Sequence, residues 1–199
     1  MLDRLFRRRR DTRAATEFFV KIVGQARDPV FYRDLGVPDT LDGRFDMVVL
    51  HVFLVMHRLK GQGAAAADWS RQLYETMIDN FEKSLMEQGV GDSGISRRVK
   101  TMARGMAGRI QAYDRALAPG AERDPLDGGL LEVALDNNVY GTAPDADRAH
   151  LAAMTAYVRR QVAGLAEQPL ESLLAGQIHF SPVHGDGDHF DGAPDARME

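Results

Sequence analysis

The longest apolar run of the chain covers residues 47–56, in which His51 is the only polar residue. The run is too short to cross a membrane, because a spanning helix needs about 20 apolar residues. Asp39 or Thr40 can cap a helix that contains the run, and the glycines that follow are stop signals. The pattern predicts a central helix over about 40–60, apolar on nearly all sides, which other helices must surround.

Amphipathic segments on both sides of this run predict the surrounding helices. In each of them apolar residues recur at steps of three and four, which places them on one helix face. The expected helices cover 11–26, 65–87, 95–117, 126–138 and 145–166, and a brief helical turn covers 170–175. Asp11 or Thr12 is expected to cap the first helix, and residues 30–38 to form a connector. The predicted fold is an all-α, single-domain bundle of about six to seven helices around the central one.

The segment 95–117 has the most regular apolar pattern. Its apolar stripe consists of Ile95, Val99, Met102, Met106, Ile110, Tyr113 and Leu117. These residues fall within about 80° of arc on a helix, and their spacing is also typical of coiled coils. Gly105 and Gly108 interrupt the helix at a cost of about 1 kcal/mol each relative to alanine. We therefore expect a neighbouring helix, or a bound peptide, to approach the backbone there.

The opposite side of the same segment is basic. It carries Arg97, Lys100, Arg104 and Arg115, with Arg98 and Arg109 beside them. Two interpretations remain open: a solvated face that pairs with the acidic side of the helix over 65–87, or a docking surface for an acidic partner, RNA or lipid headgroups. RNA binding would call for exposed aromatic residues, whereas Tyr113 lies on the apolar stripe. A protein or a membrane is therefore the favoured partner, and no specific nucleic acid is expected.

Composition narrows the classes of function. With 199 residues and 44% hydrophobic content, the chain can close one core. A net charge of -4 gives no overall attraction to nucleic acid. The chain has no cysteine, which excludes disulfides, thiolate metal sites and a cysteine nucleophile.

The two ends of the chain differ in composition from its middle. The first ten residues combine Leu2, Leu5 and Phe6 with Arg7, Arg8, Arg9 and Arg10. Such a segment can lie on an anionic membrane surface, and a solvated end is the alternative. It has no continuous apolar stretch typical of a secretory signal. We expect a basic segment over 1–10, a helical domain over 11–180 and a disordered polar tail over 181–199.

Candidate chemistry is sparse. His51 and His57 lie about 120° apart on the central helix and cannot act as an i, i+4 ligand pair. A buried histidine with a hydrogen-bond partner is favoured over a haem or metal ligand, and His51 with Arg58 predicts a polar seam. The histidines and aspartates of the tail do not follow a metal-binding loop, and the chain has no phosphate loop or nucleophile elbow. We expect no catalytic residue, no cofactor and no metal, and hence no enzyme.

Several blocks of residues resemble those of the ubiquinol-cytochrome c chaperone family. They are Phe31-Tyr32 before residues 36–40, residues 50–54 with 58–60, Gly108-Arg109 with Tyr113-Asp114 and Leu117, Ala134-Leu135 with residues 138–141, and residues 173–176 with Phe180. The blocks occur in the order of the family and cover about 17–180. Asn137 departs from the pattern, because the resemblance leads us to expect arginine before Asn138. A partner contact made by that arginine would be weakened or relocated here.

The resemblance implies a non-enzymatic assembly factor. Members of the family bind newly made cytochrome b and assist assembly of ubiquinol-cytochrome c reductase, with a small partner protein and near the ribosome exit. This chain would act in the cytoplasm, peripheral to the inner membrane. Candidate partner contacts are Arg97, Lys100, Arg104, Arg109, Tyr113 and Asn138.

Met86, Met102 and Met106 could line a client groove, since flexible methionines adapt to varied shapes, or they could fill the core. Two other functions remain open. One is haem handling through His51 or His57, and the other is membrane binding through the basic first ten residues.

Overall fold

The computed structural model describes residues 2–87, 92–120, 129–143 and 147–184. These residues form eight helices and no strand, so the predicted all-α class is confirmed. The helices are α1 (Leu2–Ala26), α2 (Pro29–Arg33), α3 (Leu41–Leu59), α4 (Ala64–Glu87), α5 (Asp92–Ala116), α6 (Leu130–Val139), α7 (Arg148–Glu167) and α8 (Leu170–Leu174).

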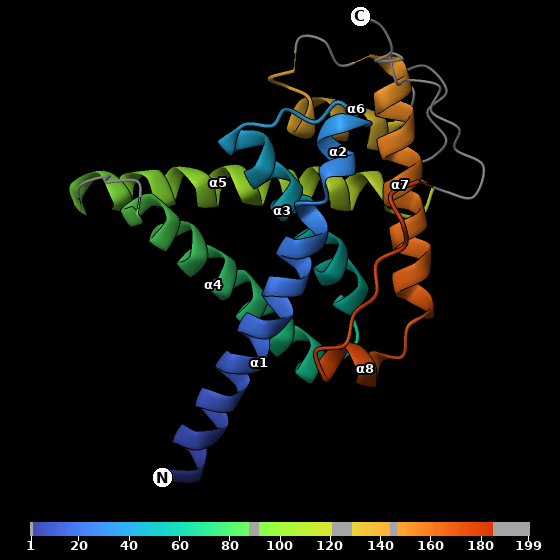
Figure 1. Cartoon of the computed structure of the whole chain (residues 1–199). Coiled ribbons are helices and arrows are strands. Elements are labelled where there is room, and N and C mark those ends of the chain that lie inside the picture. The colour runs from blue at the N-terminus through green and yellow to red at the C-terminus, as the bar shows by residue number, and fades with distance from the viewer. Residues whose placement is uncertain (1, 88–91, 121–128, 144–146, 185–199) are drawn as a thin grey trace, which may run out of the picture.

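Helix α3 is the centre of the bundle, as its apolar run predicts. It packs against α1, α4, α5, α6 and α7 (Figure 1), and every residue from Asp46 to Val55 is buried. Each fully buried side chain of valine, leucine or phenylalanine contributes roughly 1.5–3 kcal/mol relative to an exposed one. Burial of this single helix is therefore the largest apolar contribution that one element makes to the fold.

Local sequence sets both ends of α3. The Thr40 hydroxyl accepts a hydrogen bond from the Gly43 amide at 3.1 Å, which caps the first turn. A side chain at Gly43 would not fit, because a Cβ atom there would lie 2.1 Å from the Pro38 carbonyl oxygen. The chain leaves the helix through Gly61, whose positive φ of 75° is costly for other residues.

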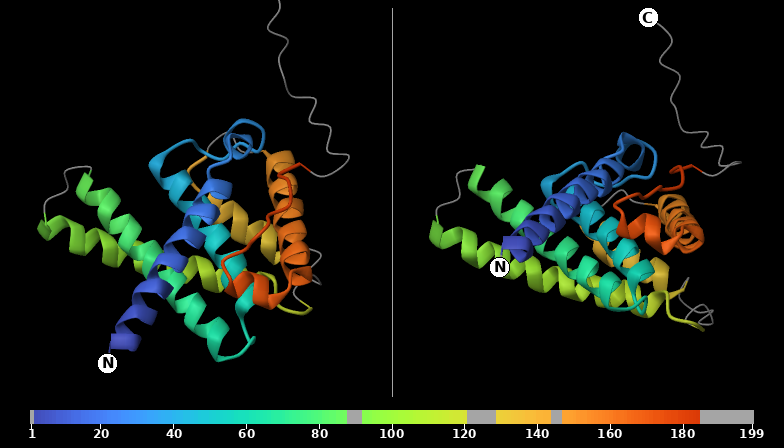
Figure 2. Two further views of the ribbon diagram at one scale, coloured as in Figure 1. Left: turned by 60° about the horizontal axis from the view of Figure 1, so that its bottom comes forward. Right: turned by 90° about the horizontal axis from the view of Figure 1, so that it is seen from below.

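Helix α1 begins at Leu2, nine residues earlier than the sequence pattern predicts. Asp11 and Thr12 lie inside the helix and are not its caps. The physical reason is that no glycine or proline interrupts the chain before Gly24, so nothing stops the helix from continuing toward the N-terminus. Its first turns extend beyond the other helices (Figures 1 and 2).

The expected connector over 30–38 contains the additional short helix α2. Pro29 occupies the first turn, where its missing N–H costs nothing, and the Asp28 carboxylate accepts a hydrogen bond from the Val30 amide at 3.0 Å. The Asp-Pro pair thus ends α1 and also starts α2.

Other boundaries move by a few residues. Helix α7 begins at Arg148, because the Asp147 carboxylate caps it by accepting from the His150 amide at 2.8 Å. Residues 144–146, expected in its first turn, lie outside the described residues, as do residues 121–128 before α6.

Residues 181–184, expected to begin the disordered tail, pack against the helices. The Gln161 side chain exchanges two hydrogen bonds of 2.9 Å with the Ser181 backbone, and Gln168 pairs with the His179 backbone in the same way. Val183 is buried, and the His184 ring contacts the Asp34 carboxylate at 2.9 Å. Gln161 of α7 and Gln168 at its C-cap therefore hold an extended segment whose last residues composition assigns to the tail. Residues 185–199 lie outside the described residues.

His51 is fully buried, and both of its ring nitrogens are hydrogen-bonded. Nδ1 donates to the Met47 carbonyl oxygen at 2.8 Å, since a carbonyl can only accept, and Nε2 then accepts from the Tyr157 hydroxyl at 2.7 Å. The rings of Phe31 and Phe180 meet it edge-on. Burial lowers the pKa of His51 to about 4, so the ring is neutral and links α3 to α7.

We expect His51→Ala to lower the free energy of unfolding by about 1–3 kcal/mol, because it leaves buried polar partners unpaired. Urea unfolding at pH 7 measures the change. His179→Ala is the matched control, since the His179 side chain is exposed and only its backbone is held. Equal stability of the His51 variant and the wild type would contradict the role assigned to this hydrogen-bonded pair.

Candidate functional site

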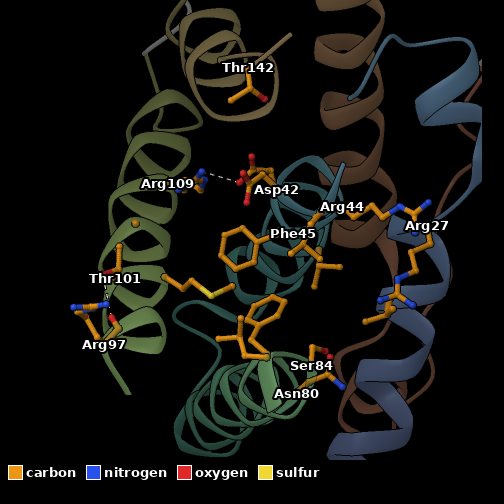
Figure 3. A pocket seen from close by; sticks show the side chains of 18 residues that line it. Arg27, Asp42, Arg44, Phe45, Asn80, Ser84, Arg97, Thr101, Arg109 and Thr142 are labelled. Carbon is orange, nitrogen blue, oxygen red and sulfur yellow. Dashed lines mark hydrogen bonds and ion pairs between the residues drawn. The ribbon is translucent and has the colours of Figure 1, made fainter. Parts of the chain in front are cut away.

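A pocket of about 820 Å³ opens between α1, α3, α4 and α5. Figure 3 shows α5 on one side of it, α1 on the other, the start of α3 at the back and α4 below. Its apolar lining consists of Val23, Leu41, Phe45, Val48, Phe81, Leu85 and Met102. The pocket falls within the size range of ligand sites, which are mostly apolar with a few polar groups.

Two aromatic rings form the centre of the apolar lining. Phe45 of α3 and Phe81 of α4 lie with their ring centroids 4.6 Å apart, and both are half-buried. Phe81 continues the apolar stripe of α4, whose members Leu73 and Met77 are fully buried. Phe81 and Leu85, the last residues of this stripe, line the pocket.

The predicted methionine groove is wrong for two of its three residues. Met106 is fully buried in the core, and Met86 is exposed at the end of α4 without lining the pocket. Only Met102 faces the pocket. The difference arises because Met106 lies one turn further along the stripe of α5, where α3 covers the helix.

An ion pair between a buried aspartate and a half-buried arginine forms part of the polar lining of the pocket. Arg109 Nη2 lies 2.7 Å from Asp46 Oδ1, outside the angles of a hydrogen bond, and the guanidinium sits 5.7 Å above the Phe45 ring centre. Burial raises the pKa of Asp46 to about 7 although Arg109 opposes the shift. Gly105 leaves room for this arrangement, since a Cβ atom there would lie 3.0 Å from Arg109 Nη1.

Tyr113 cannot contact a partner in this structure, which corrects its place among the candidate contacts. Its ring is fully buried against Phe53, and its hydroxyl has no hydrogen-bond partner in the described part of the chain. Burial, with the Asp46 carboxylate nearby, raises its pKa far above the usual range. The reason is its position on the apolar stripe of α5, which faces α3.

The other candidate contacts divide between two helices. Arg97, Lys100 and Arg104 are exposed on α5, and Arg97 also lines the pocket. Asn138 lies half-buried on α6, where its amide donates to the Ala134 carbonyl at 2.7 Å. In the ranges that the structure describes, no ion pair joins these basic residues to α4.

His51 and Arg58, expected to form a polar seam, both lie where α3 meets α7. Arg58 Nε donates to the Leu165 carbonyl at 2.8 Å and its Nη2 to the Gln168 carbonyl at 3.0 Å. Both carbonyls lie at the C-terminal end of α7, where Leu165 O also accepts from the Gln168 amide at 3.3 Å. The Arg58 side chain therefore caps the C-terminal end of α7.

Gly105 and Gly108 do not mark a close contact with a neighbouring helix, which was one of the two expected reasons for them; a bound peptide stays a prediction. A Cβ atom at Gly108 would meet nothing within 4 Å, and at Gly105 it would meet only the side chain of Arg109. The glycines instead leave the surface of α5 open beside the pocket.

The described residues offer little to a metal or a haem. They contain no group of three or more histidine, aspartate or glutamate residues that could hold a metal ion. His51 has no free ring nitrogen and no exposed surface, which removes it as a haem ligand in this structure. Of the described helices, none has the length and apolar character needed to span a bilayer. The side chains of Arg7, Arg8, Arg9 and Arg10 lie outside the described residues.

In its described residues the protein is all-helical, with an enclosed central helix and an open, mostly apolar pocket beside it. The family model described as ubiquinol-cytochrome C chaperone matches residues 33–180. The chain therefore belongs to the ubiquinol-cytochrome c chaperone family, as its sequence blocks suggested.

Known relatives are similar over most of this chain. A crystal structure of the Cbp3 homolog from Brucella abortus superposes with a TM-score of 0.75 at 33% identity, covering 92% of this chain and 98% of that one. Mitochondrial protein CBP3 of Saccharomyces cerevisiae is 25% identical over 76% of this chain and 44% of its own length. Ubiquinol-cytochrome-c reductase complex assembly factor 1 of Xenopus laevis is 26% identical over 77% of this chain and 73% of its own length. The chain thus spans less than half of the yeast protein.

We expect Gly108→Ala to raise the free energy of unfolding by about 1 kcal/mol, because the site is open and alanine favours helix. Gly43→Ala should do the opposite, since its Cβ would collide with the Pro38 carbonyl. Urea unfolding of both variants measures the difference. A destabilised Gly108→Ala would mean that another group approaches this backbone after all.

We expect rising pH to destabilise the wild type relative to Asp46→Asn. Between the ordinary pKa of aspartate, near 3.8, and about 7, the folded state keeps a proton that the unfolded state has lost. The stability that this proton provides is present below pH 4 and is lost as pH rises through 7. Melting temperatures from pH 4 to 8 should show the variant gaining on the wild type until about pH 7. A difference independent of pH would contradict the burial of this carboxyl group.

Proposed function

We propose that this chain is a non-enzymatic assembly factor for ubiquinol-cytochrome c reductase that holds an apolar segment of newly made cytochrome b in the pocket between α1, α3, α4 and α5. Family membership supports the role, because relatives are named as assembly factors of that complex. The observation that carries the proposal is the open pocket with Phe45, Phe81 and Met102 in its lining.

The pocket suits an apolar segment better than a small polar substrate. Its centre is a pair of aromatic rings, and the nearest polar groups, Asp46 and Arg109, are already paired with each other. Covering Phe45 and Phe81 would remove apolar surface from water, at about 25 cal/mol for each Å² buried. A client membrane protein needs such cover before it reaches the bilayer, because its apolar segments otherwise aggregate.

The chain would act at the cytoplasmic face of the inner membrane. The first turns of α1, which carry the basic residues of segment 1–10, extend beyond the bundle and could meet anionic headgroups (Figure 1). A small partner subunit, implied by the family resemblance, would use a surface away from the pocket. Both features are part of the proposal and leave the client site unchanged.

Loss of the gene should lower cytochrome b and its haem absorbance in membranes while other respiratory complexes persist. A copy carrying Thr101→Trp should fail to restore cytochrome b, because Thr101 is an exposed residue of the pocket lining and tryptophan would fill the space. Ala107→Trp is the matched control, exposed on the same helix but outside the lining. Cytochrome b levels in isolated membranes measure both.

Two results would contradict the proposal in different ways. Normal cytochrome b without the gene would mean that the family role does not apply to this chain. Full rescue by Thr101→Trp would leave the role intact but move the client site away from the pocket.

A further inference from the structure

The polar lining of the pocket carries more positive than negative charge. Its charged members are Arg27, Arg44, Arg97 and Arg109, against Asp42 and Asp46. Two of the four arginines have a carboxyl partner within the chain, since Arg44 lies 2.6 Å from Asp39 and Arg109 lies 2.7 Å from Asp46.

Arg27 and Arg97 remain without an ion pair or a side-chain hydrogen bond in the described part of the chain. Arg27 directly follows α1 and Arg97 lies on α5, so the two cations flank the apolar lining from opposite sides (Figure 3). Asp42 is the one carboxylate of the described lining that lacks such a partner. The open pocket therefore presents an apolar floor between two unpaired guanidinium groups.

Basic charge continues from the pocket along the outer surface of α5. Lys100 and Arg104 are exposed one and two turns beyond Arg97, and the sequence has no acidic residue between Asp92 and Asp114. Basic side chains of a bound segment would be repelled by this surface of α5, whereas acidic side chains would be attracted to it.

The pocket lining also favours one backbone conformation of a bound segment. Most of the lining comes from four helices, whose backbone N–H and C=O groups bond within each helix. An extended segment would bury its own backbone groups here without partners, at a cost of roughly 1–3 kcal/mol for each group. A helix satisfies its own backbone, so it can place an apolar stripe in the pocket without that cost.

We propose that the occupant of the pocket is an amphipathic helix of the client with acidic residues beside its apolar stripe. The stripe packs against Phe45 and Phe81, and the acidic residues pair with Arg27 and Arg97. This inference rests on the proposed function, since it names the kind of client segment that the same pocket accepts.

Three synthetic helical peptides with one apolar stripe test the inference. They differ only in two flanking positions, which are both glutamate, both glutamine or both lysine. Fluorescence anisotropy with the full chain should give the tightest binding for glutamate and the weakest for lysine. We expect a difference of at least about fivefold at low ionic strength, which shrinks as salt screens exposed charges.

A charge reversal in the protein identifies the residues responsible. Arg97→Glu should remove the preference for the glutamate peptide and improve binding of the lysine peptide. Arg148→Glu makes the same change of net charge on α7, at an exposed residue outside the pocket, and should leave the order of affinities unchanged. The Thr101→Trp variant should weaken all three peptides.

The outcomes separate this inference from the proposed function. Equal affinity of the three peptides, lost in Thr101→Trp, would overturn the acidic flank and leave the pocket as the client site. Binding of no peptide, or binding insensitive to Thr101→Trp, would overturn the acidic flank together with the pocket as the client site, and would leave the assembly role to be decided by the gene deletion. Binding of dodecyl phosphate with no binding of any peptide would have the same two consequences, because it would assign the pocket to a small amphiphilic anion.

Discussion

Enclosure of α3 is the constraint on which the rest of the structure depends. Ten consecutive residues of this helix, from Asp46 to Val55, are shielded from water, and five other helices are needed to shield them. A polar group on such a helix is costly unless it is paired. His51 therefore bonds to Tyr157 of α7, and Asp46 pairs with Arg109 of α5. These two contacts join α7 and α5 to α3 at polar positions of the buried helix.

The cover around α3 is incomplete at its N-terminal end, and the pocket lies there. Phe45 and Val48 belong to the central helix but face the opening between α4 and α5. The Asp46–Arg109 pair lies on the same wall, where burial holds the pKa of the carboxyl near neutrality. An incompletely covered apolar surface of α3 therefore lies beside the Asp46–Arg109 ion pair. A partner that covers the opening would complete the enclosure that the chain itself leaves unfinished.

The apolar pattern was sufficient to predict the central helix, the order of the long helices and the burial of His51, because these depend on hydrophobic periodicity. The apolar pattern did not predict features that depend on single polar side chains, such as helix caps and long-range hydrogen bonds. Asp11 resembles a cap but lies inside α1, and the two glutamines that bind residues 179 and 181 look like ordinary surface residues. Of the predicted contacts, Arg97 and Arg109 reach the pocket, whereas Tyr113 is buried because its stripe faces α3. The place of Phe45 and Phe81 in an open pocket was not predicted, since periodicity cannot distinguish an apolar helix face that is covered from one that is open.

Photo-crosslinking in growing cells tests the central claim most directly. A photoreactive phenylalanine analogue at Thr101, in the pocket lining, should crosslink to newly made cytochrome b. The same analogue at Ala163, an exposed residue of α7 outside the pocket, should not. Crosslinks from position 163 alone, or from neither position while both variants support assembly, would contradict the account of the pocket as the client site.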